Sequence, residues 1–265
     1  MTSIIIGIVI LIIGGVLIVL RRKQQDKLLE IKSTQTSTAK DLTELCQSVK
    51  DELGTTGGFK QQAEVKGVIR CDRPITGELS KQACVYYDMK VEERYEETYY
   101  ENDAQGRQQR RTRTGSTVVA SNSQRIPFYV DDGTGRVLIN PNSADIDPVQ
   151  VLSQYEARAS GTITVGGFSF TASSGRGDRR ILGYQFAERI LPLERNVYIL
   201  GEASDSSGQL TIQVPGEKGK PFLITLKSEE ELARSTESAI KGLMAGAIIC
   251  WVIGIGAVAY SVFAK

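Results

Sequence analysis

Two apolar stretches, IIIGIVILIIGGVLIVL at residues 4–20 and LMAGAIICWVIGIGAVAYSVF at residues 243–263, decide the fold of this chain. Neither stretch contains a charged residue or a proline. A helix rises ~1.5 Å per residue, so the first stretch nearly reaches and the second reaches the ~30 Å thickness of a bilayer core. We therefore predict transmembrane helices at residues 3–20 and 243–263, with one folded domain between them.

Two other interpretations of these stretches have less support. A cleaved secretory signal has basic residues before its apolar core and a small-residue cleavage site after it, whereas here Arg21, Arg22 and Lys23 follow the first stretch and no A-x-A site does. Buried core helices are the second alternative, but a soluble protein rarely places its most apolar stretches at both termini. Membrane spans remain the interpretation that fits both stretches.

The basic residues near the spans predict an orientation. Nearly all of them lie on the domain side: Arg21, Arg22, Lys23, Lys27, Lys227, Arg234 and Lys241, against Lys265 alone on the other side. Because Lys and Arg are enriched in the cytoplasmic segments that flank membrane helices, we expect the domain to face the cytoplasm and both termini to lie outside.

Composition excludes several classes of function. The formal net charge of +1 provides no field to attract nucleic acid. The chain has no histidine, so Ser-His and Cys-His nucleophiles are excluded, and its four cysteines form no C-x-x-C motif for structural zinc. The phosphate-binding motifs G-x-x-x-x-G-K-[ST] and G-x-G-x-x-G are also missing. We assign no catalytic, metal or cofactor residue, and expect the lipid bilayer and a protein of unknown identity as partners.

Helices are predicted next to both spans, at residues 21–54 and 228–242. Within the first segment, Thr38 can cap a helix that ends at Gly54. Its apolar positions recur at helical spacing, and we expect this stripe to pack on the domain: Leu42, Leu45, Val49 and Leu53. A separate partner or the membrane surface is the alternative contact for the stripe. Before the second span, Ser228 and Glu231 form a capping box, so one helix can run from there into the membrane.

Small residues recur along one face of the second span, at Gly242, Gly246, Cys250 and Gly254. Such a face permits close helix contact, and we expect it to pack against the first span or against another copy of the chain. The alternative is the ordinary glycine frequency of membrane helices.

Residues 60–226 have the signature of a β domain. Residues 84–100 and 107–120 read as a long hairpin, and residues 126–130 and 136–139 as a tight one at an Asp-Gly turn. Residues 161–174 read as a hairpin or a mobile insertion, and short strands follow at residues 182–191, 197–202, 209–214 and 221–225. Asp147 before Pro148 predicts a short helix over Pro148–Ala157. The fold class is therefore a membrane-anchored α+β fold that is mainly β, with a barrel- or sandwich-like domain between two transmembrane helices and juxtamembrane helices.

Three clusters in this domain have competing interpretations. The long hairpin sets Glu96, Glu97 and Glu101 near Arg107, Arg110, Arg111 and Arg113, as a docking surface or, as we prefer, as cross-strand charge pairs that protect an exposed hairpin. Asp131, Asp132 and Asp145 lie near a Gly turn, but they lack the EF-hand spacing, so turn formation is preferred over calcium binding. Cys71 and Cys84 have no activating base, so a small apolar role is preferred over a redox role.

Several blocks of the domain, in order, resemble the GIDE domain, also called the beside-a-membrane domain, of the mulan-type mitochondrial and plastid E3 ubiquitin ligases. The resemblance covers roughly residues 60 to 235 and the flanking membrane helices. Its signature positions are Cys71, Asp72, Pro74, Glu78, Cys84, Tyr86, Tyr87, Pro127, Phe128, Asp131, Gly135, Glu188, Gly201, Glu202, Pro221 and Phe222.

The resemblance implies a domain held beside a membrane, which in the ligases precedes a RING finger that recruits the ubiquitin-charged enzyme. The present chain stops at Lys265, so no catalytic residue of the family can be carried over. We expect a non-enzymatic scaffold or interaction module, as in RING-less bacterial relatives; the alternative is a ligase component whose RING comes from another subunit. The mitochondrial relatives also imply the intermembrane space, opposite to the orientation that the charges predict.

Overall fold

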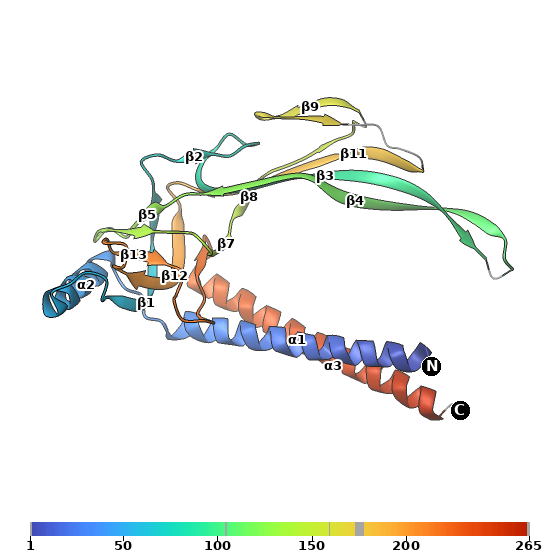
Figure 1. Cartoon of the computed structure of the whole chain (residues 1–265), viewed down its shortest axis with the longest axis horizontal. Coiled ribbons are helices and arrows are strands. Elements are labelled where there is room, and N and C mark those ends of the chain that lie inside the picture. The colour runs from blue at the N-terminus through green and yellow to red at the C-terminus, as the bar shows by residue number, and fades with distance from the viewer. Residues whose placement is uncertain (1, 104, 159, 173–177, 264–265) are drawn as a thin grey trace.

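Two long helices form an antiparallel pair. The computed structural model describes residues 2–103, 105–158, 160–172 and 178–263. In it, α1 (Thr2–Ser33) and α3 (Glu229–Phe263) lie side by side, so that both termini lie at the far end of the pair from the β strands (Figure 1). Both helices are long and apolar enough to cross a membrane, and most of their apolar side chains are exposed. This arrangement fits a membrane protein with two spans.

Glycines bring α1 and α3 close together. A Cβ added to Gly254 would lie 2.8 Å from Cγ of Leu11 and 3.1 Å from the carbonyl oxygen of Gly7. A Cβ on Gly246 would lie 3.4 Å from Leu17, whereas one on Gly242 would meet nothing within 4 Å. Gly246 and Gly254 of the predicted small-residue face therefore lie against α1, and Gly242 faces open space.

A closed barrel forms the part of the β domain nearest the helices. Its strands are β1 (Lys60–Arg70), β5 (Phe128–Asp131), β6 (Arg136–Ile139), β13 (Thr211–Gln213) and β12 (Asn196–Ser204). The ring closes because β1 pairs with both β5 and β12. Two short strands, β14 (Leu223–Thr225) and β7 (Asp145–Asp147), extend the sheet from β12. The barrel encloses a core in which Ile69, Phe128 and Ile199 are almost fully buried.

A second sheet continues away from the barrel. Its strands are β2 (Ile75–Thr76), β3 (Ala83–Asn102), β11 (Arg179–Pro192), β8 (Val149–Glu156) and β4 (Gln108–Arg125), with β4 paired to β3. The β3–β4 pair, which we call the long hairpin, extends in the same general direction as the helix pair (Figure 1). The hairpin β9 (Gly161–Val165) and β10 (Phe168–Ala172) covers this sheet and completes a second core with Met89 and Phe186.

A third, smaller apolar cluster joins the helices to the barrel. Ile31 of α1 and Leu232 of α3 pack with Tyr198 and Leu200 of β12 and with Leu223 of β14. Each of these side chains is at most 5% exposed. Because one residue from each helix is buried against the barrel, the helix pair and the β domain are packed together where the helices meet the domain.

The main fold prediction is confirmed: the chain is mainly β, with a barrel and two terminal apolar helices. Both predicted caps are also present, since Thr38 caps α2 (Ala39–Leu53) and Ser228 exchanges the hydrogen bonds of the expected capping box with Glu231 at the start of α3. The long hairpin and the tight hairpin form as expected. The hairpin expected at residues 161–174 is present as β9–β10, while residues 173–174 lie outside the described residues.

Two local predictions are wrong. Pro148–Ala157 was expected to be helical, but Val149–Glu156 is strand β8, because pairing with β11 and the alternating burial of Val149 and Val151 against the second core override the capping signal. In α2 the buried face contains Ala39, Leu42, Cys46 and Val49, whereas Leu45 and Leu53 are exposed. The apolar face of α2 therefore packs on the barrel as expected, but Ala39 and Cys46 belong to this face in place of Leu45 and Leu53.

Candidate interaction surfaces

A buried carboxylate organises the junction between the barrel and the helices. Glu64 of β1 is only 1% exposed, and the hydroxyl of Tyr198 donates to it at 2.6 Å. The hydroxyl of Thr36, in the segment between α1 and α2, donates to the same carboxylate at 2.5 Å. Nζ of Lys66 lies 2.9 Å from Glu64 and donates to Glu229, in the first turn of α3, at 2.7 Å. One network therefore links the segment after α1 and the first turn of α3 to the barrel. We call the α1–α3 pair the membrane anchor.

The network shifts the protonation equilibria of two of its members. Burial, reinforced by the hydrogen bond to Glu64 and its charge, raises the pKa of the Tyr198 hydroxyl well above its usual range. Burial acts to lower the pKa of Lys66, but the carboxylates of Glu229 and Glu64 outweigh it and raise that pKa. The network holds these groups as a neutral phenol and a charged ammonium, which suits a structural role rather than proton transfer near neutral pH.

Further ion pairs join the juxtamembrane parts of the helices to their surroundings. Nζ of Lys27 in α1 donates to Asp145 of β7 at 2.9 Å, and Nζ of Lys220 donates to Glu30 of α1 at 2.6 Å. The Lys27–Asp145 pair is exposed on its aspartate side and the Lys220–Glu30 pair is partly buried, and each contributes little on its own. Together with the apolar cluster around Ile31, they fix the direction in which the helix pair leaves the barrel.

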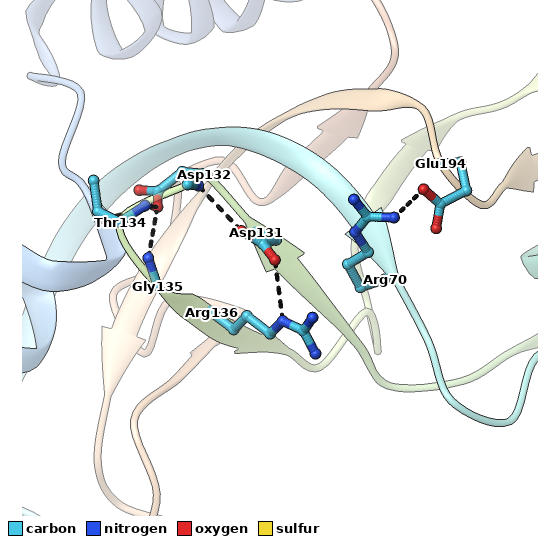
Figure 2. A network of polar contacts seen from close by, with 8 residues as sticks. Arg70, Asp131, Asp132, Thr134, Gly135, Arg136 and Glu194 are labelled. Atoms are coloured by element: carbon cyan, nitrogen blue, oxygen red, sulfur yellow. Dashed lines mark hydrogen bonds and ion pairs between the residues drawn. The ribbon is translucent and has the colours of Figure 1, made fainter.

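The turn between β5 and β6 anchors α2, and Figure 2 shows the polar contacts within the turn itself. The Asp132 carboxylate accepts hydrogen bonds from the backbone N–H groups of Thr134 and Gly135 at 2.8 Å and 3.1 Å, and from the N–H of Ala39 at 2.6 Å. Burial would raise the pKa of Asp132, but these donors outweigh it and lower the pKa. Asp132 therefore closes its own turn and also caps the first turn of a helix far away in the sequence.

A cleft of about 820 Å³ opens between the barrel and the first turn of α3. Its walls include Lys66, Arg70, Asp131 and Glu231. Several of its charges are already paired, since Arg70 forms an ion pair with Glu194 and Asp131 with Arg136 (Figure 2). The cleft is open and is lined by charged and apolar residues alike, and among the described residues no group of three or more His, Cys, Asp or Glu could hold a metal ion.

A second buried carboxylate stabilises the loop between β2 and β3. Glu188 of β11 is fully buried and accepts backbone hydrogen bonds from Leu79 and Ser80, both at 2.8 Å. A Cβ on Gly77 would lie 2.7 Å from this carboxylate, so the loop can approach closely only with glycine there. Burial, together with the charge of Glu188, raises the pKa of the nearby Cys84 thiol to about 11. Cys84 is thus held as an inert thiol.

The two cysteines considered for redox chemistry lie in different cores. Cys71 packs at the edge of the barrel core, Cys84 is buried in the second core, and both are free thiols. The three aspartates considered for calcium are also committed elsewhere, because Asp132 holds its turn and α2, Asp131 pairs with Arg136, and Asp145 pairs with Lys27.

The long hairpin carries the predicted pattern of cross-strand charge pairs. Arg113 lies 2.7 Å from Glu97, and Arg111 lies 3.0 Å from Glu101. Arg110 pairs with Tyr100 in the ladder, and its side chain forms no ion pair with a described residue. These contacts are exposed on both strands, so they keep the hairpin soluble but leave an extended polar surface available to a partner.

The model of the GIDE family, described as E3 ubiquitin ligase, matches residues 96–259, more than half of the 265 residues. The chain belongs to the GIDE family. The match begins within β3 and ends within α3.

Two plant ligases are similar to part of this GIDE chain. E3 ubiquitin-protein ligase SPL1 of Arabidopsis thaliana is 28% identical over 113 residues, which are 42% of this chain and 31% of the ligase. E3 ubiquitin-protein ligase SP1 of the same plant is 29% identical over 119 residues, 44% of this chain and 33% of the ligase. The alignments thus span about a third of each relative. No solved structure matches the chain.

The GIDE signature positions do not converge on one site. Phe128 and Phe222 fill the barrel core, where Gly201 leaves room, since a Cβ there would lie 2.8 Å from the Phe222 ring. The remaining positions are spread over the domain: Cys84, Tyr87 and Glu188 in and beside the second core; Tyr86 at the edge of the barrel core, under Arg125; Asp131 and Gly135 in the β5–β6 turn; Glu78 near Asn122; Glu202 near Gly216; and Asp72, Pro74, Pro127 and Pro221 in connecting segments. Their contacts are those of residues that hold the fold.

Sequence reasoning missed the residues that hold the anchor to the domain. Glu64 and Lys66 lie in β1, whereas Tyr198 lies in β12, far away in the sequence. Nothing in the pattern of either strand shows that these side chains meet. Asp132 was noticed, but only as a turn residue. The sequence carries no local signal for Glu64, because a charged residue between the apolar positions Ala63 and Val65 is the normal alternation of a half-buried strand.

Proposed function

We propose that this GIDE chain is a non-enzymatic, membrane-anchored interaction module whose β domain binds a protein partner beside the bilayer. The observation that supports it most is the junction: Ile31, Leu232 and the Glu64 network pack both helices against the barrel. Such a junction sets where the β domain stands relative to the membrane, which is what a scaffold or docking module requires.

The charged and titratable side chains of the β domain favour binding over catalysis. The cleft beside α3 presents charges that are mostly paired, and the shifted pKa values of Tyr198 and Cys84 move away from neutrality. General acid–base and nucleophilic catalysis need the opposite, a group tuned toward the working pH. With no histidine and four scattered cysteines, these 265 residues also cannot supply the zinc ligands of a RING.

We propose further that the β domain faces the cytoplasm and that both termini lie on the other side of the membrane. The basic residues on the domain side support this orientation, and the antiparallel helix pair keeps the two termini together (Figure 1). A cysteine introduced at the exposed position Gln109 provides the test. In intact cells, labelling of the Gln109→Cys variant by a membrane-impermeant thiol reagent would contradict the cytoplasmic placement, and labelling only after permeabilisation would support it.

A second candidate function is a component of a ubiquitin ligase whose RING is supplied by another subunit. The family model and the names of the two Arabidopsis relatives favour it. The two candidates share an interaction surface but differ in the partner, since the second requires a RING protein.

Photo-crosslinking in native membranes separates these candidates. A photoreactive residue replaces Gln109 on the long hairpin or, as a matched control, Ile12, which is exposed on the apolar part of α1. The interaction module predicts discrete protein adducts from position 109 and mainly lipid adducts from position 12. A RING protein among the adducts would favour the second candidate, and adducts to lipid alone from both positions would refute a protein-binding role.

A further inference from the structure

The basic residues near the membrane anchor fall into two groups. Those farther from the apolar stretches have carboxylate partners, in the pairs Lys27–Asp145, Lys32–Glu237 and Lys227–Asp147. Those at the edge of the stretches form no ion pair with a described residue: Arg21, Arg22, Lys23 and Lys241. The rule that relates basic residues to orientation does not distinguish the two groups, so it does not explain this difference.

The unpaired cations lie at the level of the lipid headgroups. The first three of them directly follow the apolar residues 4–20, and Lys241 lies just before the second apolar stretch. At ~1.5 Å per residue, each lies within ~5 Å of the hydrocarbon, and the headgroup layer of one leaflet is ~5–7 Å thick. The first carboxylates along the two helices, Asp26 and Glu237, lie ~9 Å from the apolar stretches and therefore beyond that layer. The nearest counter-charge at the level of these cations is thus the lipid phosphate.

A groove between α1 and α3 begins at the same level. It has a volume of about 440 Å³, and its walls include Gln25, Asp26 and Leu29 of α1 and Ile240 and Lys241 of α3. Among the described residues, only those of the two helices line it. The groove therefore opens to the surroundings of the membrane anchor and not to the barrel.

Two arginines complete the lower end of this groove. Arg22 precedes Leu29 by two turns, so it lies on the face of α1 that forms the wall. Arg21 continues the seven-residue spacing of Gly7 and Gly14, both of which lie against α3. The Nε atom of Arg21 is buried and has no hydrogen-bond partner among the described residues. The Arg21 side chain is therefore held between the helices with part of its donor capacity unused.

We propose that this groove binds the headgroup of an anionic phospholipid from the leaflet beside the β domain. The phosphate lies at the membrane edge, where Arg21, Arg22 and Lys241 supply charge-assisted hydrogen bonds. Basic pockets between membrane helices recognise anionic headgroups in this way. Above the phosphate, the amide of Gln25 is available to the hydroxyl groups of the headgroup, and Leu29 to its carbon atoms.

The charge of the groove favours an anionic lipid over a zwitterionic one. Of the two carboxylates in its walls, Glu237 is paired with Lys32 at 2.7 Å, and Asp26 forms no ion pair with a described residue. Three cations therefore stand against one free carboxylate. A choline headgroup would bring its own cation into this excess of positive charge, whereas a glycerol headgroup brings none.

This inference goes beyond the proposed function. The lipid site requires only the membrane anchor, whereas the proposed function depends on a protein-binding surface of the β domain. The photo-crosslinking above and the experiment below can therefore fail independently.

Native mass spectrometry of the full chain in detergent micelles tests the lipid preference. Dioleoyl phosphatidylglycerol and dioleoyl phosphatidylcholine are titrated separately, and the affinity of the first bound lipid is measured for each. We expect phosphatidylglycerol to bind at least ~10-fold more tightly, because its phosphate meets three cations. Equal affinities for the two lipids would refute the site, as would displacement of phosphatidylglycerol by an equal concentration of soluble glycerol phosphate.

Single substitutions test the position of the site. Arg22→Gln and Lys241→Gln should each weaken phosphatidylglycerol binding about fivefold, the effect of one cation near an anionic lipid surface. Lys23→Gln is the matched control, because Lys23 is also exposed and at the membrane edge but lies two residues after Arg21, on the side of α1 away from α3. It should change the affinity by less than about twofold. An equal loss in Lys23→Gln, or no loss in the other two variants, would overturn the proposal.

Discussion

Replacing Asp132 with alanine should release α2 from the barrel. In the structure the carboxylate accepts the N–H of Ala39 at 2.6 Å, and Ala39 itself is 1% exposed, so no solvent can replace the lost acceptor without a local opening. Thr38 caps a different donor, the N–H of Asp41, and therefore cannot compensate. The substitution leaves a buried helix donor unsatisfied.

The expected cost is about 2–4 kcal/mol. An unsatisfied buried donor costs roughly 1–3 kcal/mol, and the loss of the more exposed bonds from Thr134 and Gly135 adds about 1 kcal/mol. Because each 1.4 kcal/mol is a factor of ten, opening of α2 should become about 30-fold or more frequent. Amide hydrogen exchange of residues 42–50, measured on the full chain in nanodiscs, reports this local opening.

Asp131→Ala is the matched control. Asp131 is the neighbouring carboxylate, but it bonds only within its own turn, to Gly133 and Arg136. Its removal should leave exchange in α2 within about threefold of the parent, as for a surface substitution. If Asp132→Ala leaves α2 unchanged, or if Asp131→Ala loosens α2 as much, then the contact with Ala39 does not anchor the helix.

Three further outcomes are expected. Glu188→Ala should free the loop at Leu79 and Ser80 and destabilise the second sheet by roughly 2–4 kcal/mol, because a buried and a part-buried N–H group lose their acceptor; chemical denaturation followed by tyrosine fluorescence measures this. Gly254→Ile should separate α1 from α3, seen as lost disulfide crosslinking between cysteines placed on the two helices, whereas Gly256→Ile, which meets open space, should not. Because the pKa of Tyr198 is raised in the folded state, its contribution to the free energy of unfolding is complete below the unfolded pKa of ~10 and is lost as pH rises above that value. The decrease in the free energy of unfolding at alkaline pH should therefore be smaller in Tyr198→Phe.

The elements that sequence could predict are those with local signals. The apolar stretches mark α1 and α3, and the Thr38 and Ser228 caps mark the starts of α2 and α3 because the capping partner lies only three residues away. The Asp-Gly turn marks the β5–β6 hairpin for the same reason. Where the partner is distant the prediction fails: Asp147 and Pro148 signal a helix, but pairing of β8 with β11, some 35 positions later, makes a strand.

The contacts that join the anchor to the domain were beyond sequence reasoning. Glu64 acquires its role from the hydroxyl groups of Tyr198 and Thr36, which are brought to it only when the barrel closes and the segment after α1 docks. A buried carboxylate is costly unless it is paired, so its presence in β1 depends on the tertiary structure that supplies those donors. Likewise, closure of the barrel rests on the double pairing of β1, which strand patterns alone do not specify.

A non-enzymatic role is tested most directly by single-turnover discharge of a ubiquitin-charged carrier enzyme in the presence of the purified full chain in nanodiscs. The proposed interaction module predicts a discharge rate equal to that with empty nanodiscs. Discharge above the empty-nanodisc rate by the chain alone, with no RING subunit present, would contradict the non-enzymatic role.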